Sequence, residues 1–404
     1  MRTQYWAVLV LALLAWSWFA RPIYELCWVV MRRIAEQVSL RTAPATTTAP
    51  RDQVIERMVE QGREIDEYLA QHRATLAEQA RRSQATARSQ ASDSSATDLE
   101  AARAQLRHSL DFPPPRFDGS RVGKIEEHPL GEDELARYSE WRIPVLPGLH
   151  ASGIYARPKS ARAEERLPLI IAAPGRHGAP AAGAADVRMA TRSARDLAWE
   201  PLARGFAVWL PTFVFYGPDN DDDFRYRLTM RARQSGTSLL SIEIAKLVRT
   251  LDAIEQQRDD IDPARIAMMG FSYGGFYALH TAALEPRIRA LIVMGYFNDR
   301  EAVLRQAEPY GYIDWRFDRS VALWRDPELA ALVAPRPFFV QFGTQDPLFA
   351  VAGARKAAAE AASRYATVGA ADRFEAHEFV AKHEFDTRPA MDFLTRQFGG
   401  SSRH

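Results

Sequence analysis

The chain has 404 residues, of which 47% are hydrophobic and 25% charged, and its formal net charge is +1. This balance is typical of a globular protein and gives no reason to expect nucleic-acid binding. The single cysteine, Cys27, lies in an apolar N-terminal stretch. The rest of the chain therefore has no disulfide, no cysteine-based metal site and no cysteine nucleophile.

The first apolar stretch covers residues 5–20 and contains no charged side chain. A helix of this length spans about 24 Å, close to the ~30 Å hydrocarbon core of a bilayer. We predict an uncleaved membrane anchor within residues 1–41. A cleaved signal peptide and a buried helix are the alternatives, although Trp18 and Phe19 are too large for an ordinary cleavage site.

Basic residues flank this stretch on both sides and bear on its orientation. Arg2 and the amino terminus favour an N-terminus inside the cell, whereas Arg21, Arg32 and Arg33 favour the reverse. We expect the first orientation, which places the following residues in the periplasm or outside the cell.

Residues 42–110 predict a linker and a helical, partly low-complexity stalk. Over residues 51–80 the apolar side chains follow a partial heptad spacing, which predicts a helix. Its apolar seam offers a surface for a homodimer, and a polar stalk helix with a weak apolar stripe is the alternative. Residues 99–110 predict a second helix. In the first of these helices Ile55, Gly62, Leu69 and Leu76 are spaced seven apart, and Met58 and Ile65 fill the seam between them.

From residue 111 to residue 404 the pattern predicts an α/β domain. Residues 138–145 and 151–157 predict paired strands around the turn Pro147-Gly148. Short apolar runs then alternate with helical segments, which predicts a mostly parallel sheet with helices on both faces. The runs are 167–173, 206–210, 265–269, 290–294, 337–342 and 374–380, and the helices are 198–204, 236–256 and one from 276 onward.

The segment 265–275, RIAMMGFSYGG, places Ser272 between an apolar strand and a helix. This is a G-x-S-x-G motif in the strand–turn–helix setting in which a serine nucleophile is exposed on a sharp turn. Gly270 and Gly274 leave room for the turn, and Gly275 allows the helix to pack closely. A glycine-rich packing turn without chemistry is the alternative.

A serine hydroxyl needs a histidine that accepts its proton and a carboxylate that orients the histidine. Asp346 follows the strand 337–342 in a turn and is the expected acid, with Asp299 as the alternative. His383 lies in the loop after the last strand and is the expected base, with His377 on that strand as the alternative.

The oxyanion that forms during acyl transfer needs backbone N–H donors. We expect these from Tyr273, at the start of the helix, and from Arg176, in the loop after residues 167–173. His177 either lines the substrate pocket or satisfies hydrogen bonds within its loop. Tyr296 and Phe297 either form an acyl pocket or pack in the core.

Residues 219–223, DNDDD, with the nearby Arg225 and Arg227, form a charged segment. Their spacing lacks the glycine and the distal glutamate of a calcium loop. We interpret the segment as a solvated loop above the site, and we expect neither a metal ion nor a cofactor.

Residues 110–398 resemble the α/β-hydrolase superfamily, and within it the dienelactone-hydrolase-like and acetyl-xylan-esterase-like bacterial serine esterases. The resemblance implies Ser272, Asp346 and His383 as a catalytic triad. It also implies hydrolysis of small-molecule or sugar esters through an acyl-enzyme. Where the family usually has His-Gly after the first buried strand, this chain has Pro174-Gly175. The resemblance rests on residues 260–266, 270–275, 332–337 with Gly343 and Asp346, and 383–385.

Two other functions are compatible with parts of the pattern. The segment 270–275 also resembles prolyl-oligopeptidase-like peptidases, but the preceding residues show no sign of the β-propeller that such enzymes carry. A catalytically silent hydrolase fold that binds partners near the membrane through residues 51–110 is the other alternative.

Overall fold

The computed structural model describes residues 56–65, 67–69, 98–114, 117, 122–176, 197–214, 223–304 and 324–398. The chain divides into two compact units, Met1–Ala49 and Pro50–His404, and every described residue belongs to the second. The predicted membrane segment within residues 1–41 lies outside the described residues. Among the helices that are described, none has the length and apolar character needed to cross a membrane.

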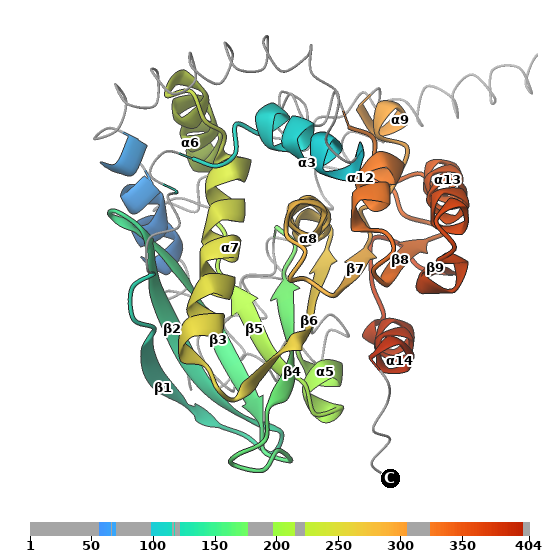
Figure 1. Ribbon diagram of the computed structural model, residues 1–404. Coiled ribbons are helices and arrows are strands. Elements are labelled where there is room, and N and C mark those ends of the chain that lie inside the picture. Colours follow the sequence, from blue (N-terminus) through green and yellow to red (C-terminus); the bar gives the residue numbers. More distant parts are fainter. Residues whose placement is uncertain are drawn as a thin grey trace, which may run out of the picture. The chain divides into compact units, whose positions relative to one another are not determined.

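A nine-stranded sheet forms the centre of the described residues, in the order β1-β2-β3-β5-β4-β6-β7-β8-β9 (Figure 1). The pairs β1–β2, β2–β3 and β3–β5 are antiparallel. All pairs from β5 to β9 are parallel, which agrees with the predicted mostly parallel sheet. The strands are β1 Glu126–Glu132, β2 Ala136–Leu146, β3 Leu149–Pro158, β4 Leu167–Ala173, β5 Ala207–Pro211, β6 Ile261–Phe271, β7 Ala290–Met294, β8 Phe338–Gly343 and β9 Phe374–Phe379.

Helices connect the parallel strands, because a parallel pair needs a crossover connection long enough to return to the same end of the sheet. Local signals fix several of their ends. Ser238 accepts a hydrogen bond from the Ser241 backbone and caps α7, and Asp386 caps α14 through the Arg388 backbone. The helices are α3 Asp98–Ser109, α5 Trp199–Ala203, α6 Asp223–Gln234, α7 Leu239–Gln257, α8 Tyr273–Leu284, α9 Arg300–Leu304, α12 Asp326–Val333, α13 Val351–Thr367 and α14 Thr387–Gln397.

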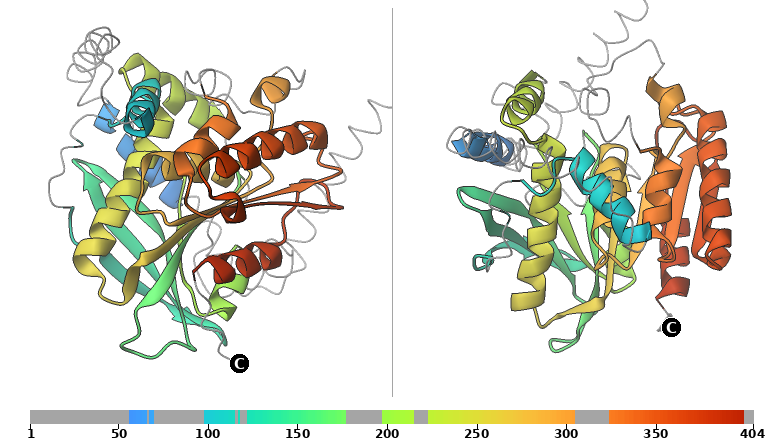
Figure 2. Two further views of the ribbon diagram at one scale, coloured as in Figure 1. Left: turned by 45° about the vertical axis from the view of Figure 1, so that its right-hand side comes forward. Right: turned by 45° about the horizontal axis from the view of Figure 1, so that its top comes forward.

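The sheet has a hydrophobic cluster on each face because side chains alternate along every strand. In β4, Leu169 and Ile171 belong to one cluster, whereas Ile170 and Ala172 belong to the other. The first cluster is covered by α3, α7, α8, α12 and α13, and the second by α5 and α14 (Figure 2). Both faces of the parallel strands are thus shielded from water, as the sequence predicted.

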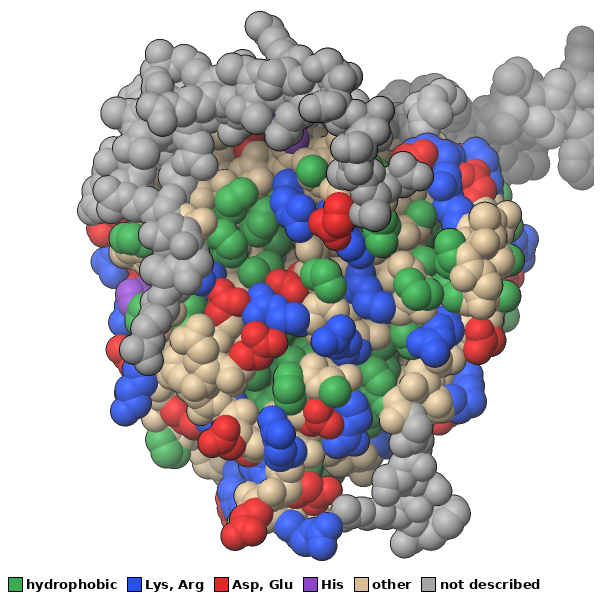
Figure 3. All heavy atoms as spheres, viewed as in Figure 1, with side chains coloured by type: hydrophobic (Ala, Val, Ile, Leu, Met, Phe, Trp, Pro, Cys, Tyr) green, Lys and Arg blue, Asp and Glu red, His purple; other side chains and the backbone are tan. Residues whose placement is uncertain are grey.

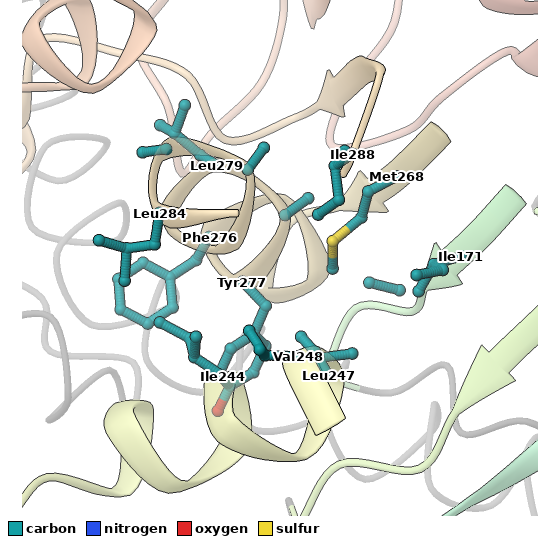
Figure 4. Packing of buried hydrophobic residues seen from close by; sticks show 14 of the residues in the cluster. Ile171, Ile244, Leu247, Val248, Met268, Phe276, Tyr277, Leu279, Leu284 and Ile288 are labelled. Carbon is teal, nitrogen blue, oxygen red and sulfur yellow. The ribbon is translucent and has the colours of Figure 1, made fainter. Parts of the chain in front are cut away.

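Helix α8 packs between α7 and the central strands. Phe276 and Tyr277 of α8 lie beside Ile244 and Val248 of α7, and Met268 of β6 belongs to the same cluster (Figure 4). The α8 residues are fully buried apart from a small exposed part of Leu284. A helix that is apolar on all sides is held in one position, and the turn at its N-terminus is held with it.

Helical residues 56–65 and 67–69 belong to the same hydrophobic core as the sheet. Met58, Ile65 and Leu69, which form most of the seam predicted for a stalk, are at most 1% exposed. Glu64 accepts hydrogen bonds from Arg142 and from the His150 backbone, at 2.8 and 3.0 Å. The sequence analysis placed a domain boundary at residue 110, but packing is continuous across it in the described residues.

The surface seen in Figure 3 carries acidic and basic side chains side by side. Neither sign forms a continuous field over the elements on this face, in accordance with the net charge of +1. An interspersed surface of this kind does not attract polyanions strongly.

Candidate active site

Ser272 is the single residue between the end of β6 and the start of α8. Its backbone has φ 54° and ψ −118°, a conformation that non-glycine residues rarely adopt. Two hydrogen bonds hold it there: the Ser272 N–H donates to the Met294 carbonyl at 2.8 Å, and the Phe276 N–H donates to the Ser272 carbonyl at 3.1 Å. The strained turn presents the hydroxyl at the carboxyl end of the parallel strands.

The two glycines of the motif are required by close backbone contacts around this turn. A Cβ atom on Gly270 would overlap the Gly274 carbonyl, and one on Gly274 would overlap the Ala173 carbonyl at the end of β4. Gly275 is less crowded, since its Cβ would lie 2.9 Å from Tyr296 Cβ. The spacing of the motif therefore follows from how tightly β4, β6 and α8 approach one another.

The structure brings together Ser272, His383 and Asp346. His383 Nε2 lies 2.9 Å from Ser272 Oγ, and His383 Nδ1 lies 2.7 Å from Asp346 Oδ2. Because a carboxylate only accepts, the contact with Asp346 fixes a proton on Nδ1 and leaves Nε2 able to accept one from the serine. The Asp346 side chain is only 1% exposed, against 19% for His383.

Asp346 and His383 meet because their loops follow neighbouring parallel strands, β8 and β9. Backbone hydrogen bonds join the two loops: Thr344 donates to Phe379 and Gln345 to Ala381, both at 2.9 Å. Asp346 Oδ1 in turn accepts from the Leu348 and Phe349 backbone N–H groups, at 2.8 and 3.1 Å. Both carboxylate oxygens are therefore occupied, and the carboxylate has a fixed direction.

The imidazole of His383 contacts two aromatic rings that the sequence analysis did not anticipate. Phe271 and Phe349 have their ring centroids 4.7 and 5.7 Å from that of His383. Phe271 directly precedes the serine, and Phe349 follows the acid by three positions. Only their proximity to the motif residues could have pointed to them, since nothing in a single phenylalanine indicates such a contact.

The alternative acid and base lie elsewhere. Asp299 pairs with Lys356 at 2.6 Å. His377 is on β9, where its ring stacks on Phe339. His280 is buried in α8 with its Nδ1 atom 2.9 Å from the Phe276 carbonyl, and burial, assisted by the charge of Arg300, lowers its pKa to about 4.

The two expected oxyanion donors belong to segments that lie next to the serine. Tyr273 is the first residue of α8, so its N–H is one of the groups that form the positive end of the helix dipole. Gly175 lies against the serine, since a Cβ on it would be 3.4 Å from Ser272 Cβ, and Arg176 follows directly. His177, the expected pocket residue, lies outside the described residues.

Tyr296 and Phe297 are both in the core, 1% and 2% exposed. Tyr296 packs between Phe276 and Phe349, at centroid distances of 5.7 and 5.9 Å. Phe297 meets Phe338 edge-on at 5.4 Å. Core packing, the alternative given by the sequence, accounts for these contacts.

Arg225 was expected in a solvated loop, and this expectation is wrong. It lies on α6 and is only 4% exposed. Its guanidinium donates to the Val214 carbonyl and to the Tyr277 hydroxyl, and it lies 5.0 Å from the centroid of the Tyr273 ring. Residues 219–222 of the acidic run lie outside the described residues. Across the described part of the chain, no group of three or more potential metal ligands is found.

Comparison with solved structures identifies the fold. A glucuronoyl esterase from Teredinibacter turnerae T7901 matches with a TM-score of 0.53 and 17% identity over 76% of this chain and 86% of its own. A "putative acetyl xylan esterase" from Bacteroides fragilis NCTC 9343 matches with a TM-score of 0.54 and 16% identity over 70% and 74%. The chain has the α/β-hydrolase fold.

Sequence comparison finds a relative among curated proteins. "Putative hydrolase YtaP" of Bacillus subtilis (strain 168) is 31% identical over 133 residues, which are 33% of this chain. The match spans 44% of the relative, less than half of its length. No family model matches the chain.

Proposed function

We propose that this protein is a serine carboxylic ester hydrolase that acts through an acyl-enzyme on small acyl esters, acetyl esters among them. The observation that carries the proposal is the continuous chain of contacts from Ser272 Oγ through His383 to Asp346, at 2.9 and 2.7 Å. The esterases among the proteins of similar fold support the choice of an ester as substrate.

In the first half-reaction the Ser272 oxygen attacks the ester carbonyl while His383 Nε2 takes the hydroxyl proton. Asp346 stabilises the imidazolium and keeps it aligned. The carbonyl oxygen becomes an oxyanion, which accepts hydrogen bonds from the backbone N–H groups of Tyr273 and Arg176. One such donor is typically worth about 10²–10³-fold in rate.

The same groups act in reverse order to complete the cycle. His383 gives its proton to the departing alkoxide, so that the alcohol leaves and the acyl group stays on Ser272. His383 then takes a proton from water, which attacks the acyl-enzyme, and the acid is released as the serine regains its proton. Every proton transfer uses a group of this chain, and no step requires a metal ion or a cofactor.

Replacing the nucleophile tests the proposal. Ser272→Ala should lower hydrolysis of 4-nitrophenyl acetate by about 10⁶-fold, because no other group can form the acyl-enzyme. Asp346→Asn should lower kcat by about 10⁴-fold, since the amide favours the wrong tautomer of His383. Unchanged circular dichroism and melting temperature would show that both variants are folded. Hydrolysis at the wild-type rate by Ser272→Ala would refute the assignment.

Two further measurements separate the alternative functions. A fluorophosphonate probe should label the wild-type chain at Ser272, whereas a catalytically silent binding protein would not react. Acetyl, longer acyl and sugar esters should be compared with a proline-containing peptide. Cleavage of the peptide in preference to every ester would favour a prolyl-oligopeptidase-like peptidase instead.

We also propose that the protein is anchored to a membrane by residues 5–20, with the hydrolase outside the cytoplasm. The support is the uncharged apolar run of the sequence itself. In this arrangement the substrates are esters that reach the periplasm or the cell surface.

A further inference from the structure

A buried ion pair lies behind the site without contacting the serine. Arg300, at the start of α9, donates to both carboxylate oxygens of Asp326, at the start of α12, at 3.3 and 2.7 Å. Both side chains are 2% exposed. Removing two charges from water costs several kcal/mol per ion, so such a pair is weak evidence for stability. Its presence therefore suggests a role other than stabilising the fold.

One chain of hydrogen bonds leads from this pair to the acid of the triad. Asp326 accepts from the Asn298 backbone at 2.9 Å, and the Asn298 side chain donates to the Ala350 carbonyl at 3.2 Å. Ala350 is next to Phe349, whose backbone N–H donates to Asp346 at 3.1 Å. The ion pair thus fixes the turn that carries the carboxylate.

A second connection runs through stacked side chains. The Arg300 guanidinium lies 4.1 Å from the centroid of the Tyr296 ring, and Tyr296 is 5.9 Å from Phe349. Phe349 then stacks on His383 at 5.7 Å with an interplanar angle of 22°. Both connections therefore converge on Phe349, one through its backbone and one through its ring.

We propose that Asn298 and Phe349, held by the Arg300–Asp326 pair, are positioning residues that keep the His383 imidazole aligned with Ser272. The inference rests on the proposed function. Phe349 and Phe271 both pack against the imidazole, at 5.7 and 4.7 Å, and their contacts restrict tilting of the ring away from the serine. A displacement of about 1 Å at a reacting group can lower the rate by about 10²-fold. Correct positioning of the imidazole can therefore outweigh the free-energy cost of burying the two charges.

The test compares two buried phenylalanines of the same core. Phe349→Leu removes the ring beside His383, and Phe338→Leu is the matched control, because Phe338 is 0% exposed and meets Phe297 and Phe374 edge-on instead. Both variants should lose similar stability. Phe349→Leu should lower kcat for 4-nitrophenyl acetate at least tenfold with KM within twofold of wild type, whereas Phe338→Leu should keep kcat within twofold.

A second readout does not depend on hydrolysis. In the Ser272→Ala background, the ¹⁵N chemical shift of His383 Nδ1 should move toward that of a free imidazole in Phe349→Leu and stay unchanged in Phe338→Leu. If Phe349→Leu does not fold, Asn298→Ala, which removes the side-chain bond to Ala350, should move the shift in the same direction. Equal shifts in test and control variants would overturn the inference, even if the esterase proposal had already failed on its own test.

Discussion

Ser272 shows how a single residue can be held in an unfavourable conformation by its neighbours. Its positive φ costs on the order of 1–3 kcal/mol, and the structure offsets this by packing β4, β6 and α8 at backbone contact. That contact leaves no room for a side chain at position 274. The strain and the absence of a side chain are therefore two aspects of one arrangement.

Gly274→Ala should accordingly destabilise the protein by more than about 3 kcal/mol, because the new methyl group overlaps the Ala173 carbonyl. Gly175→Ala is the control, since its nearest neighbour would be Phe271 Cδ1 at 3.2 Å, a distance that a small shift can accommodate. Urea unfolding measures both. Equal losses in the two variants would show that the turn yields more easily than the contacts indicate.

Because His280 is buried, we expect the free energy of unfolding to fall at low pH. Burial lowers its pKa to about 4 from an ordinary value of 6.5, so the unfolded chain binds the proton more readily than the folded one. The stabilising contribution is complete above pH 6.5 and is lost as the pH falls toward 4, to an extent on the order of 3 kcal/mol.

Comparing the wild type with His280→Gln isolates this effect from the carboxylates, which titrate in both proteins. The unfolding free energy of the wild type should fall by about 2–3 kcal/mol more than that of the variant between pH 7 and pH 4.5. Parallel pH profiles for the two proteins would contradict the prediction.

The serine turn could be predicted at the residue scale because its signal is local. Gly270, Ser272 and Gly274 stand at fixed spacing next to an apolar strand, and the acid and base follow two later strands in the order typical of the fold. The Arg300–Asp326 pair could not be predicted. Its two members are 26 positions apart and look like ordinary surface charges until the chain is folded.

At the scale of elements, the buried strands could be located because they are short and uniformly apolar, as β4 and β7 are. β1 went unpredicted because it is mostly exposed and follows no alternation. Helix α6 was missed for a similar reason: it has a basic, polar sequence, and only its packing shows that Arg225 and Leu228 face inward. Helices and strands that are stabilised mainly by tertiary contacts have only a weak signal in the local sequence.

The helical residues 56–65 and 67–69 contribute to the stability of the unit that carries the sheet. Met58, Ile65, Tyr68 and Leu69 are each at most 1% exposed, and burial of one such side chain contributes about 1.5–3 kcal/mol. A variant lacking residues 1–70 should thus lose several kcal/mol, a large part of the 5–15 kcal/mol that stabilises a typical domain. Urea unfolding should show this loss, with a variant lacking residues 1–49 as the control.

If both shortened variants unfolded at the wild-type urea concentration, residues 56–69 would be a detachable stalk, as their heptad spacing first indicated. If only the longer deletion is destabilising, their apolar seam serves the chain's own core. A homodimer through residues 51–80 would then need a surface other than Met58, Ile65 and Leu69. Sedimentation equilibrium of the variant lacking residues 1–49 measures that directly.

On the scale of the whole molecule, the division at residue 50 separates the apolar N-terminal run from the unit that carries the site. We expect the full chain to sediment with membranes and the variant lacking residues 1–49 to stay in the supernatant with unchanged kcat. Fractionation of cells expressing each form, followed by an esterase assay, tests this. Full-length protein in the supernatant would contradict the predicted anchor.

The order of the three site residues along the chain has a consequence for biosynthesis. The ribosome adds the imidazole 111 positions after the serine, and also after β9, the last strand of the described sheet along the chain. A nascent polypeptide that ends before residue 383 holds the hydroxyl without the imidazole that lies 2.9 Å from it in the folded structure. If the proposed triad is correct, we expect a chain that ends before residue 383 to lack esterase activity even when its serine turn has formed.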